Sequence, residues 1–542
     1  MNENIDLVWL GPPDRSPAWT LGKVRPTEAT PDAIYARVQE GLPASNADAW
    51  LFWDSALGAP DPDCVRHAFA RPGDVWHAGT RLAPRGWPGL MDAIASIWML
   101  NADPDASLEA TSWRISLRAC LVRTMVLRQM GTVRPQFRSL DAAALELGHR
   151  YVTRGVLTRQ VPGLVPKKAA STTVNIPFAD ELRFVYYRFS KTWSRWAVLR
   201  GVLRGYVSPA GALAACREVY QEVRPADPSP YQHADAPTRK STPVARVTAL
   251  IPTVDRYPYL RTLLEQLRHQ TVPPAEIIVV DQTARDRRQP GLFAEFGDLP
   301  LRVIYQNEPG QCTSRNAGLQ LARGDYILFL DDDNEVEPTL IEAHLQNLER
   351  FRAEVSCGVS NEAGAGPRPA YFSYIRASDV FPTNNTLIRK DALRRSGLFD
   401  LAYDRGQRAD GDLGMRVYLA GALMVLNPGI TVFHHHAPSG GLRTHKARVV
   451  TYASSRSRLT HRHLPSTTEV YLAQRYFTQA QLREMLWQSV LGTFSIRGSY
   501  VKRAAKMLVS GFLLPLTFWE LRARTAQARQ MATQFPEIAV LS

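Results

Sequence analysis

Apolar residues in the second half of the chain follow two alternating patterns. Nearly continuous apolar runs rich in Val, Ile and Leu predict strands buried on both faces, at Arg246–Pro252, Glu276–Asp281, Leu301–Tyr305 and Asp325–Leu330. Between them, Tyr257–Gln270 and Thr313–Arg323 carry apolar residues at helical spacing. Alternating strands and helices predict an α/β fold with a parallel-rich sheet and right-handed crossovers.

Polar residues stand at the carboxyl ends of three of these runs. They are Pro252 and Thr253 after the first run, Asp281 at the end of the second, and Asp331-Asp332-Asp333 after the last. Ligands of parallel α/β sheets bind beyond the carboxyl ends of the strands. We therefore expect these residues to converge on one cleft.

The three adjacent aspartates are costly after a buried strand unless a cation is near. They can form a solvated turn that caps the helix expected soon after Pro338, because Asp favours such positions. They can also bind Mg²⁺ or Mn²⁺, which prefer hard oxygen ligands and neutralise a departing diphosphate. The other polar residues expected at the same edge favour the metal site.

Further candidate site residues lie on either side of the acidic turn. A helix that opens at Gln311 and carries Arg315 and Asn316 suits a phosphate or nucleotide. Asp281 can accept hydrogen bonds from a base or ribose, or can simply end a strand. Asp410 begins a helical pattern, where it can cap the helix or act as a general base. His434-His435-His436 can supply a metal ligand or diphosphate contact, or form a surface turn.

Taken together, residues 245–440 resemble the inverting family-two glycosyltransferases of GT-A fold. The matching segments are ALIPTVDR, QTVPPAEIIVVDQT, GQCTSRNAGLQLARGDYILFLDDD, NNTLIRKDALRRSGLFD and ADGDLGMRVYLAG. The resemblance implies a donor site whose base, usually uracil, is held by Pro252, Thr253 and Asp281, with Arg315, Asn316 and Asp332 as further substrate contacts. It also implies metal ligands at Asp331 and Asp333.

The resemblance assigns the catalytic base to Asp410, which matches the aspartate of the family's Glu-Asp catalytic pair. The glutamate of that pair is replaced by Ala409, and Asp412 is an adjacent rival. The family's usual Asn after Pro-Thr-x is Asp255 here, and no catalytic role depends on that position.

The first half of the chain repeats the second at a fixed offset in numbering. Cys120–Gly131 (CLVRTMVLRQMG) aligns with Thr386–Gly397 (TLIRKDALRRSG), which sets the offset at 386 − 120 = 266. The same offset pairs Arg150 with Arg416 and Gly155 with Gly421, without a gap. Registered glycines indicate an internal repeat of domain size.

The N-terminal copy lacks the residues expected to carry the chemistry. Ala144 stands where the C-terminal copy has Asp410, and Asp54, Ser55 and Ala56 stand for the three aspartates. Lys167 and its neighbours replace the histidines. One carboxylate is a poor divalent-metal site, so we expect this copy to be degenerate and to dock or present the acceptor.

The chain is too long for one ordinary domain and divides at a stretch rich in Pro, Ala and polar residues. We expect a degenerate glycosyltransferase-like domain at 1–170, a helical segment at 171–222, a linker at 223–243, a catalytic GT-A domain at 244–445 and a helical region at 446–542. The fold class is therefore α/β in two copies, with C-terminal helices.

Charge and composition limit the partners. A net charge of +14 favours an anionic partner, and five scattered cysteines suggest reduced thiols. Met507–Trp519 is too short to span a bilayer; its basic flanks at Lys502, Arg503, Lys506 and beyond suit an anionic interface, whereas a buried core helix is the competing interpretation. Phe178–Gly205 mixes aromatic and basic residues, as in nucleic-acid sites and in helix–helix interfaces.

These features predict a metal-dependent, inverting glycosyltransferase that uses Mg²⁺ or Mn²⁺. Its donor is a nucleotide sugar, of which a UDP-sugar is favoured, and its acceptor is a glycan or lipid-linked hydroxyl in cell-surface or extracellular glycan assembly. We expect a cytoplasmic protein, with peripheral contact to the inner membrane face as an open alternative, and no nucleic-acid partner. The alternative is a non-catalytic sugar- or nucleotide-binding scaffold, against which the acidic residues argue.

Overall fold

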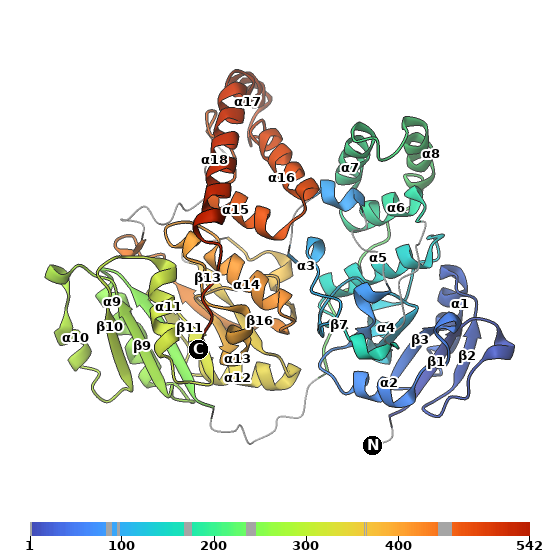
Figure 1. Cartoon of the computed structure of the whole chain (residues 1–542), viewed down its shortest axis with the longest axis horizontal. Coiled ribbons are helices and arrows are strands. Elements are labelled where there is room, and N and C mark those ends of the chain that lie inside the picture. The colour runs from blue at the N-terminus through green and yellow to red at the C-terminus, as the bar shows by residue number, and fades with distance from the viewer. Residues whose placement is uncertain are drawn as a thin grey trace.

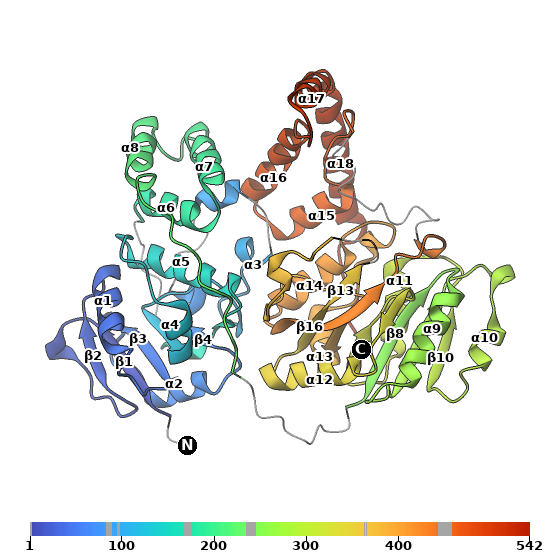
Figure 2. The same cartoon turned by 180° about the vertical axis from the view of Figure 1, so that it is seen from behind.

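The chain forms two α/β units that lie side by side, each with its own sheet (Figure 1). The computed structural model describes residues 3–82, 89–94, 98–166, 176–234, 245–362, 364, 366–442 and 458–541. From each unit a group of helices rises on the same side of the molecule, as both opposite views show (Figures 1 and 2).

The C-terminal unit is built on a nine-stranded sheet of order β10-β9-β8-β11-β15-β13-β16-β12, with β14 paired to β16. Its first four strands are parallel and β15 reverses the direction. In chain order the strands are β8 (Val247–Thr253), β9 (Glu276–Asp281), β10 (Leu301–Tyr305), β11 (Tyr326–Phe329), β12 (Asn334–Val336), β13 (Val355–Glu362), β14 (Arg376–Ala377), β15 (Thr386–Arg389) and β16 (Met424–His434). The α/β fold expected from the sequence is confirmed.

Helices cover this sheet where the helical pattern indicates. Leu260, Leu263, Leu264 and Leu267 of α9 are completely buried, because they form one stripe at helical spacing. The helices of this unit are α9 (Tyr257–Arg268), α10 (Pro290–Ala294), α11 (Gln311–Leu321), α12 (Leu340–Phe351), α13 (Lys390–Ser396) and α14 (Ala409–Leu419).

The N-terminal unit has a seven-stranded sheet of order β2-β1-β3-β6-β4-β7-β5. Its strands are β1 (Ile5–Leu10), β2 (Val24–Thr27), β3 (Ala49–Asp54), β4 (Val75–His77), β5 (Ala110–Thr111), β6 (Ala119–Arg123) and β7 (Thr158–Gln160). Its helices are α1 (Pro31–Gly41), α2 (Pro62–Phe69), α3 (Trp98–Asn101), α4 (Thr124–Met130) and α5 (Leu140–Thr153).

The two sheets share strand pairings as well as order. Ala110 of β5 pairs with Gln160, and Arg376 of β14 pairs with Leu426, so both partners are displaced by the offset of the repeat (376 − 110 = 426 − 160 = 266). Helices α4 and α13 begin and end at the same offset. Among the described residues, the edge strands β10 and β12 of the second sheet have no counterpart in the first. These pairings support the repeat; its descent from a glycosyltransferase stays a prediction.

The helical groups also correspond. They are α6 (Phe178–Arg188), α7 (Lys191–Leu203) and α8 (Pro209–Val219) on the first unit, and α15 (Thr467–Tyr476), α16 (Gln479–Gly492), α17 (Tyr500–Phe512) and α18 (Leu514–Gln534) on the second. The capping residues of α7 and α16, Ser190 and Thr478, set a separate offset for these groups (478 − 190 = 288). Phe184, Tyr186 and Tyr187 of α6 are buried, as the helix–helix interpretation of that segment expects.

The two units meet through a reciprocal contact of two glycines. A Cβ added to Gly155 would lie 2.5 Å from the carbonyl oxygen of Ile375, and one added to Gly421 would lie 2.5 Å from that of Glu109. The glycines and their carbonyl partners are both related by the offset of the repeat (421 − 155 = 375 − 109 = 266), and both glycines have positive φ. This is the self-complementary pattern of a two-fold interface.

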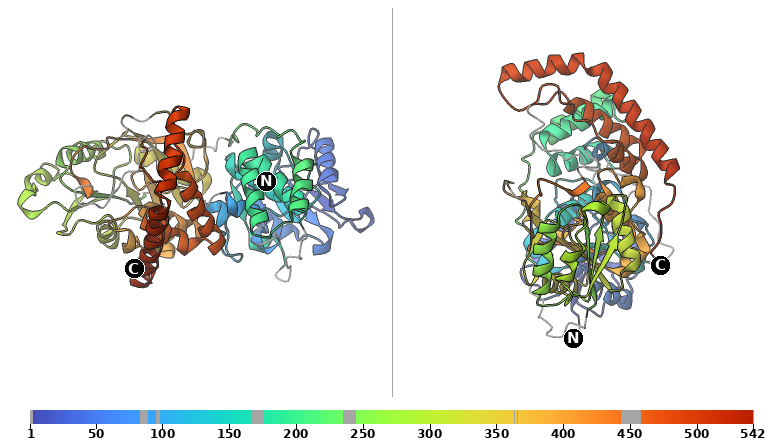
Figure 3. Two further views of the ribbon diagram at one scale, coloured as in Figure 1. Left: turned by 90° about the horizontal axis from the view of Figure 1, so that it is seen from above. Right: turned by 90° about the vertical axis from the view of Figure 1, so that its left-hand side faces the viewer.

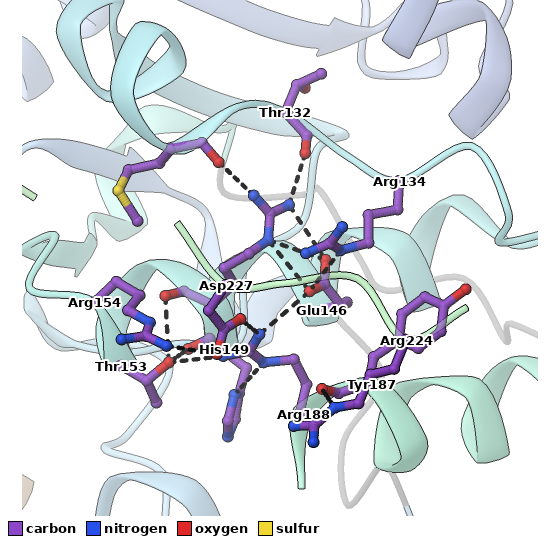
Figure 4. Close-up of polar contacts among 12 residues, drawn as sticks. Thr132, Arg134, Glu146, His149, Thr153, Arg154, Tyr187, Arg188, Arg224 and Asp227 are labelled. Carbon is purple, nitrogen blue, oxygen red and sulfur yellow. Dashed lines mark hydrogen bonds and ion pairs between the residues drawn. The ribbon is translucent and has the colours of Figure 1, made fainter. Parts of the chain in front are cut away.

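A buried charge network fixes the helical group to the N-terminal unit (Figure 4). Arg134, Arg150 and Arg188 converge on the fully buried carboxylate of Glu146. Burial raises the pKa of Glu146, but the three guanidinium groups outweigh it and hold that pKa below its usual value. Arg188 also pairs with Asp227, which lies after α8, so α5, α6 and this segment are joined.

The first part of the expected linker at 223–243 is ordered against the N-terminal unit. Residues 223–234 pack along the N-terminal unit: Tyr231 is buried, and its N–H donates to the Arg154 carbonyl over 2.8 Å. Residues 235–243, like Lys167, lie outside the described residues.

Candidate active site

The three aspartates follow β11 at the carboxyl edge of the sheet, as the sequence predicts. Asp331 is partly exposed and accepts a hydrogen bond from Arg315 of α11 over 2.9 Å. Asp332 and Asp333 are buried. The turn therefore presents one carboxylate to the cleft and two to its floor.

Strand pairing brings His434 to the acidic turn. Asn334 of β12 pairs with His434 of β16, and the imidazole Nε2 lies 3.2 Å from Oδ1 of Asp333. The other ring nitrogen lies 3.1 Å from Glu362. Burial opposes the charge on His434, yet the two carboxylates raise its pKa to about 10. Burial likewise works against ionised Asp333, but His434 and Arg256 hold its pKa below the usual value.

Asp331, Asp333 and His434 fit a divalent cation. One ligand atom from each lies within 4.8 Å of the others. Oδ1 of Asp333 is buried and, within the described residues, has no partner except the His434 ion pair. Two carboxylates and one imidazole suit Mn²⁺ or Mg²⁺ that also binds phosphate oxygens.

Asp332 holds the floor of the cleft together. It accepts hydrogen bonds from Thr253 over 2.8 Å and from Arg256 over 3.1 Å. Burial raises the pKa of Asp332, and neighbouring Asp333 adds to this effect, while Arg256 acts against it. The net result is a pKa of about 7. Asp332 thus ties the end of β8 to the acidic turn.

Two cavities meet at this turn, because Gln311, Arg315 and Asp331 line both. The smaller, about 90 Å³, is also lined by Pro252, Thr253 and Asp332. The larger, about 790 Å³, is also lined by Asp410, His434 and His436. The structure therefore brings most of the sequence-predicted residues to one cleft.

Asp410 and its rival Asp412 have different surroundings. Asp410 is exposed in the first turn of α14, lines the larger cavity, and accepts only the Gly411 N–H among the described residues. Asp412 is fully buried, pairs with Arg416 at 2.8 Å and accepts the Tyr476 hydroxyl over 2.6 Å. Asp410 alone of the two can reach an acceptor in this arrangement.

The repeat explains Asp412 as a structural residue. Its counterpart in the N-terminal unit is Glu146 (412 − 146 = 266), which pairs with Arg150 just as Asp412 pairs with Arg416. Both arginines also donate to the carbonyl at the end of the preceding helix. The N-terminal unit has this carboxylate–arginine pair although it has no counterpart of Asp410. The pair therefore stabilises the fold.

Two sequence-predicted substrate contacts are engaged elsewhere. Asp281 is fully buried and its two oxygens accept Tyr257 O–H and Thr283 N–H over 2.7 and 2.9 Å, while its neighbour Gln282 lines the smaller cavity. Asn316 exchanges two hydrogen bonds of 2.8 Å with the backbone of Phe399. Both side chains support the wall of the cleft, because their polar atoms are already hydrogen-bonded within the protein.

The expected phosphate site at the start of α11 is also filled. The Asp404 carboxylate accepts the N–H groups of Cys312 and Thr313 over 2.7 and 2.9 Å. A side-chain carboxylate therefore takes the place that a phosphate would need. Arg315, one turn further along, still lines both cavities.

Two residues that line the cleft have a strained backbone. Among the described residues, positive φ outside glycine occurs at Asp255, Arg352, Arg408 and His436. Arg408 and His436 line the larger cavity, and Arg408 is tied to Glu469 of α15 by a 2.7 Å ion pair. Strained backbone of this kind concentrates at functional sites.

Three residues of the site went unmentioned in the sequence-based prediction. They are Arg256, which ends the matched segment ALIPTVDR, and Glu362 and Asp404, which lie in no matched segment. Arg256 follows Pro252-Thr253 closely and could have been inferred as a counter-charge for the aspartates. Glu362 and Asp404 reach the site only through the fold.

Comparison with known proteins shows which family this unit resembles. Residues 248–406 match the profile described as glycosyl transferase family 2. The C-terminal unit is therefore similar to glycosyltransferases of that family. Its relatives include the putative glycosyltransferase EpsH of Bacillus subtilis (strain 168), 36% identical over 102 residues, 18% of this chain and 29% of EpsH.

A longer match is the putative teichuronic acid biosynthesis glycosyltransferase TuaG of the same organism. It is 27% identical over 201 residues, covering 34% of this chain and 74% of TuaG. The chain spans about a third or less of the length of the first relatives, 29%, 16% and 33%. Among solved structures, S. aureus TarS 1–349 in complex with UDP-GlcNAc aligns with a TM-score of 0.34 and 17% identity, covering 52% of this chain and 89% of that one.

Proposed function

We propose that the C-terminal unit is a metal-dependent, inverting glycosyltransferase. It moves a sugar from a nucleoside-diphosphate donor, a UDP-sugar, to a hydroxyl of a glycan or lipid-linked acceptor. The observation that carries the proposal is the joint cleft, where Asp331 and His434 of the candidate metal set line the same cavity as the exposed carboxylate of Asp410. The match of residues 248–406 to the family profile supports the reaction class.

Each side chain has a role that its surroundings allow. Asp410, exposed at the cavity wall, takes the proton of the acceptor hydroxyl. The acceptor oxygen then attacks the anomeric carbon from the face opposite the departing diphosphate, which inverts the configuration. Asp331, Asp333 and His434 would hold Mn²⁺ or Mg²⁺, which neutralises charge on the diphosphate. Thr253 and Arg256, fixed by Asp332, shape the donor side.

The setting of the reaction is part of the same proposal. We infer cytoplasmic action in the assembly of cell-surface or extracellular glycans, at the inner face of the membrane. All five cysteines are free, which agrees with a reducing compartment. The relative TuaG is named for teichuronic acid biosynthesis, which agrees with a role in glycan assembly.

A screen of sugar nucleotides tests the function. The full chain is incubated with UDP- and GDP-sugars, with Mn²⁺, Mg²⁺ or a chelator, and release of the nucleoside diphosphate is measured. We expect metal-dependent release with one donor, and loss of release with the chelator. Donor binding without turnover, across acceptors and metals, would identify a non-catalytic nucleotide-sugar scaffold instead.

A further inference from the structure

The outer end of the C-terminal helical group exposes large apolar side chains. On α17 and the start of α18 they include Tyr500, Val501, Leu508, Phe512, Leu516 and Trp519. Leu508 is 78% and Phe512 86% exposed. We call this set the apolar tip. Contiguous apolar surface on a folded protein marks contact with a protein or membrane partner.

The apolar tip lies at the edge of the molecule. In the side view α17 runs along the outermost border, and α18 descends from it toward the C-terminal unit (Figure 3). The two helices are bent by 61°. A helix that lies across the end of a projecting group can rest along a flat surface.

The lengths of these helices favour lying on a membrane over crossing it. Within the described residues no single helix is both long and apolar enough to span a bilayer; α17 and α18 reach that composition only as a bent pair. A helix of α17's thirteen residues is roughly 20 Å long, shorter than a hydrocarbon core of about 30 Å.

Basic side chains accompany the apolar tip. Lys502 and Arg503 lie on α17, which has no acidic residue. On α18, Arg522 and Arg529 pair with no carboxylate among the described residues, whereas Glu520 is bound by Arg462 and Arg524. The unbalanced positive charge complements an anionic surface.

Lys506, which the sequence groups with these basic flanks, has a different role. Its side chain is buried, and its ammonium donates to the carbonyls of Leu459 and His461 over 2.7 and 2.6 Å. Burial lowers its pKa. It holds the chain beneath α17 and does not face a partner.

An apolar groove lies beside the tip, between α16 and α18. It has a volume of about 450 Å³, and its lining is mainly apolar, with Trp487, Val490 and Phe518 among the residues. Arg483, Arg522 and Arg529 also line it. Apolar walls with guanidinium groups suit an acyl chain below a phosphate-bearing head group.

The corresponding helix of the first group lacks this surface. The exposed positions of α8 are Pro209, Ala210, Leu213, Ala214 and Arg217, so Leu213, 55% exposed, is the one large aliphatic side chain exposed on that helix. This difference concerns the corresponding helices α8 and α17, because α7 of the first group also exposes Leu199 and Leu203. A structural requirement of the helical fold would be expected in both groups.

We propose that the apolar tip and the neighbouring groove bind the surface of a bilayer that contains anionic lipids. The exposed side chains of α17 enter the head-group layer, and Arg522 and Arg529 meet lipid phosphates. A second copy of the chain is disfavoured as occupant, because two tips of like positive charge repel each other. The binding is independent of the transfer reaction, and it supplies a reason for the lipid-linked acceptor named above.

Vesicle flotation of the full chain, without nucleotide or metal, tests the proposal. Phosphatidylcholine vesicles with and without phosphatidylglycerol are compared. We expect co-flotation with the anionic vesicles, and at least a tenfold weaker partition for Leu508→Glu with Phe512→Glu, since each substitution places a charge in the head-group layer. Arg522→Gln and Arg529→Gln should each weaken binding to anionic vesicles about fivefold. Leu213→Glu on α8 is the matched control and should bind like the wild type.

Three results would overturn the proposal. The first is absence of wild-type binding to anionic vesicles; the second is equal loss in Leu213→Glu. The third is a wild-type dimer in sedimentation velocity that the Leu508→Glu, Phe512→Glu variant dissociates while vesicle binding persists. If the glutamate variant fails to fold by circular dichroism, quenching of wild-type fluorescence by brominated lipids, compared with Trp519→Phe, decides. Donor turnover on a water-soluble acceptor is measured separately, so a failure of the proposed reaction is distinguishable.

Discussion

The two α/β units share a sheet and differ at the ends of its strands. Asp54 and Asp331 occupy equivalent positions, five residues beyond the matched partners Ala49 and Tyr326. Asp331 lines a cavity together with His434, another member of the candidate metal set. Asp54 instead forms an ion pair with Arg118 at 2.8 Å. The strand interiors are shared by the two units, whereas the residues just beyond β3 and β11 differ between them.

The largest expected effect is on transfer activity and follows from replacing the proposed catalytic base. Asp410→Asn should lower transfer by roughly 10²- to 10⁴-fold and leave donor binding near normal, because the amide cannot take a proton. Steady-state turnover and calorimetric donor affinity measure the two effects. Near-normal turnover of Asp410→Asn, combined with loss in a folded Asp412→Asn protein, would move the base to Asp412.

The second prediction contrasts the two acidic turns. Asp333→Ala should abolish metal-dependent binding of nucleoside diphosphate, since a missing hard ligand leaves the phosphates poorly neutralised. Asp54→Ala in the first unit should leave binding and turnover unchanged. Calorimetry with and without Mn²⁺ provides the readout. Equal wild-type affinity in both conditions would refute the metal site.

A third prediction concerns what the units share. Glu146→Gln and Asp412→Asn should each lower the free energy of unfolding by about 3–5 kcal/mol, because each leaves a buried arginine without its carboxylate. Denaturant unfolding of the two variants checks this. A marked loss in only one of them would mean that the two pairs are not equivalent.

The reciprocal glycines give a smaller effect. Gly155→Ala and Gly421→Ala should each cost about 1–3 kcal/mol, from strain at positive φ and from crowding against a carbonyl oxygen. Thermal unfolding of both variants is the measurement. The expectation is near-equal loss, and a silent substitution at either glycine would contradict a symmetric contact.

The smallest expected effect is a difference in the pH dependence of stability between two corresponding glutamates. Glu181 of α6 and Glu469 of α15 are related by the offset of the helical groups (469 − 181 = 288). Burial raises the pKa of Glu181 to about 7. Burial also acts on Glu469, but the Ser466 N–H and Arg408 lower its pKa below the usual value.

These shifts predict opposite pH dependence. Glu181 contributes stability below about pH 4.5, its ordinary value, and loses that contribution as the pH rises to about 7. Glu469 contributes above its ordinary value and loses that contribution as the pH falls. Glu181→Gln should therefore flatten the stability curve between pH 4.5 and 7, and Glu469→Gln should flatten its acid side. Denaturant unfolding curves of the two variants, measured across this pH range, test the prediction. The same pH dependence in both variants would refute the contrast.

Much of the second unit could be predicted from sequence. The strands at 276–281 and 301–305 begin and end as expected, because continuous Val and Ile runs identify a buried strand without tertiary information. The short strands β12 and β14 were not predicted, since two or three residues carry no periodicity.

The site was predictable where its residues form local motifs. Asp331, Asp333 and Asp410 fall on the cleft for that reason. The engagement of Asp281 and Asn316 was not foreseen, because their partners come from other elements. Asp404 caps a helix that begins far earlier in the chain, at Gln311, a relation that no local pattern encodes.

The reciprocal glycine contact has a consequence for how such a chain could arise. A self-complementary surface is what two identical subunits use to pair, so the arrangement is that of a homodimer joined head to tail by duplication. Once both halves share one chain, selection on chemistry can relax in one half while selection on the contact persists in both. Gly155 and Gly421 match, whereas Ala144 and Asp410 differ, as the predicted loss of chemistry in the first half would require.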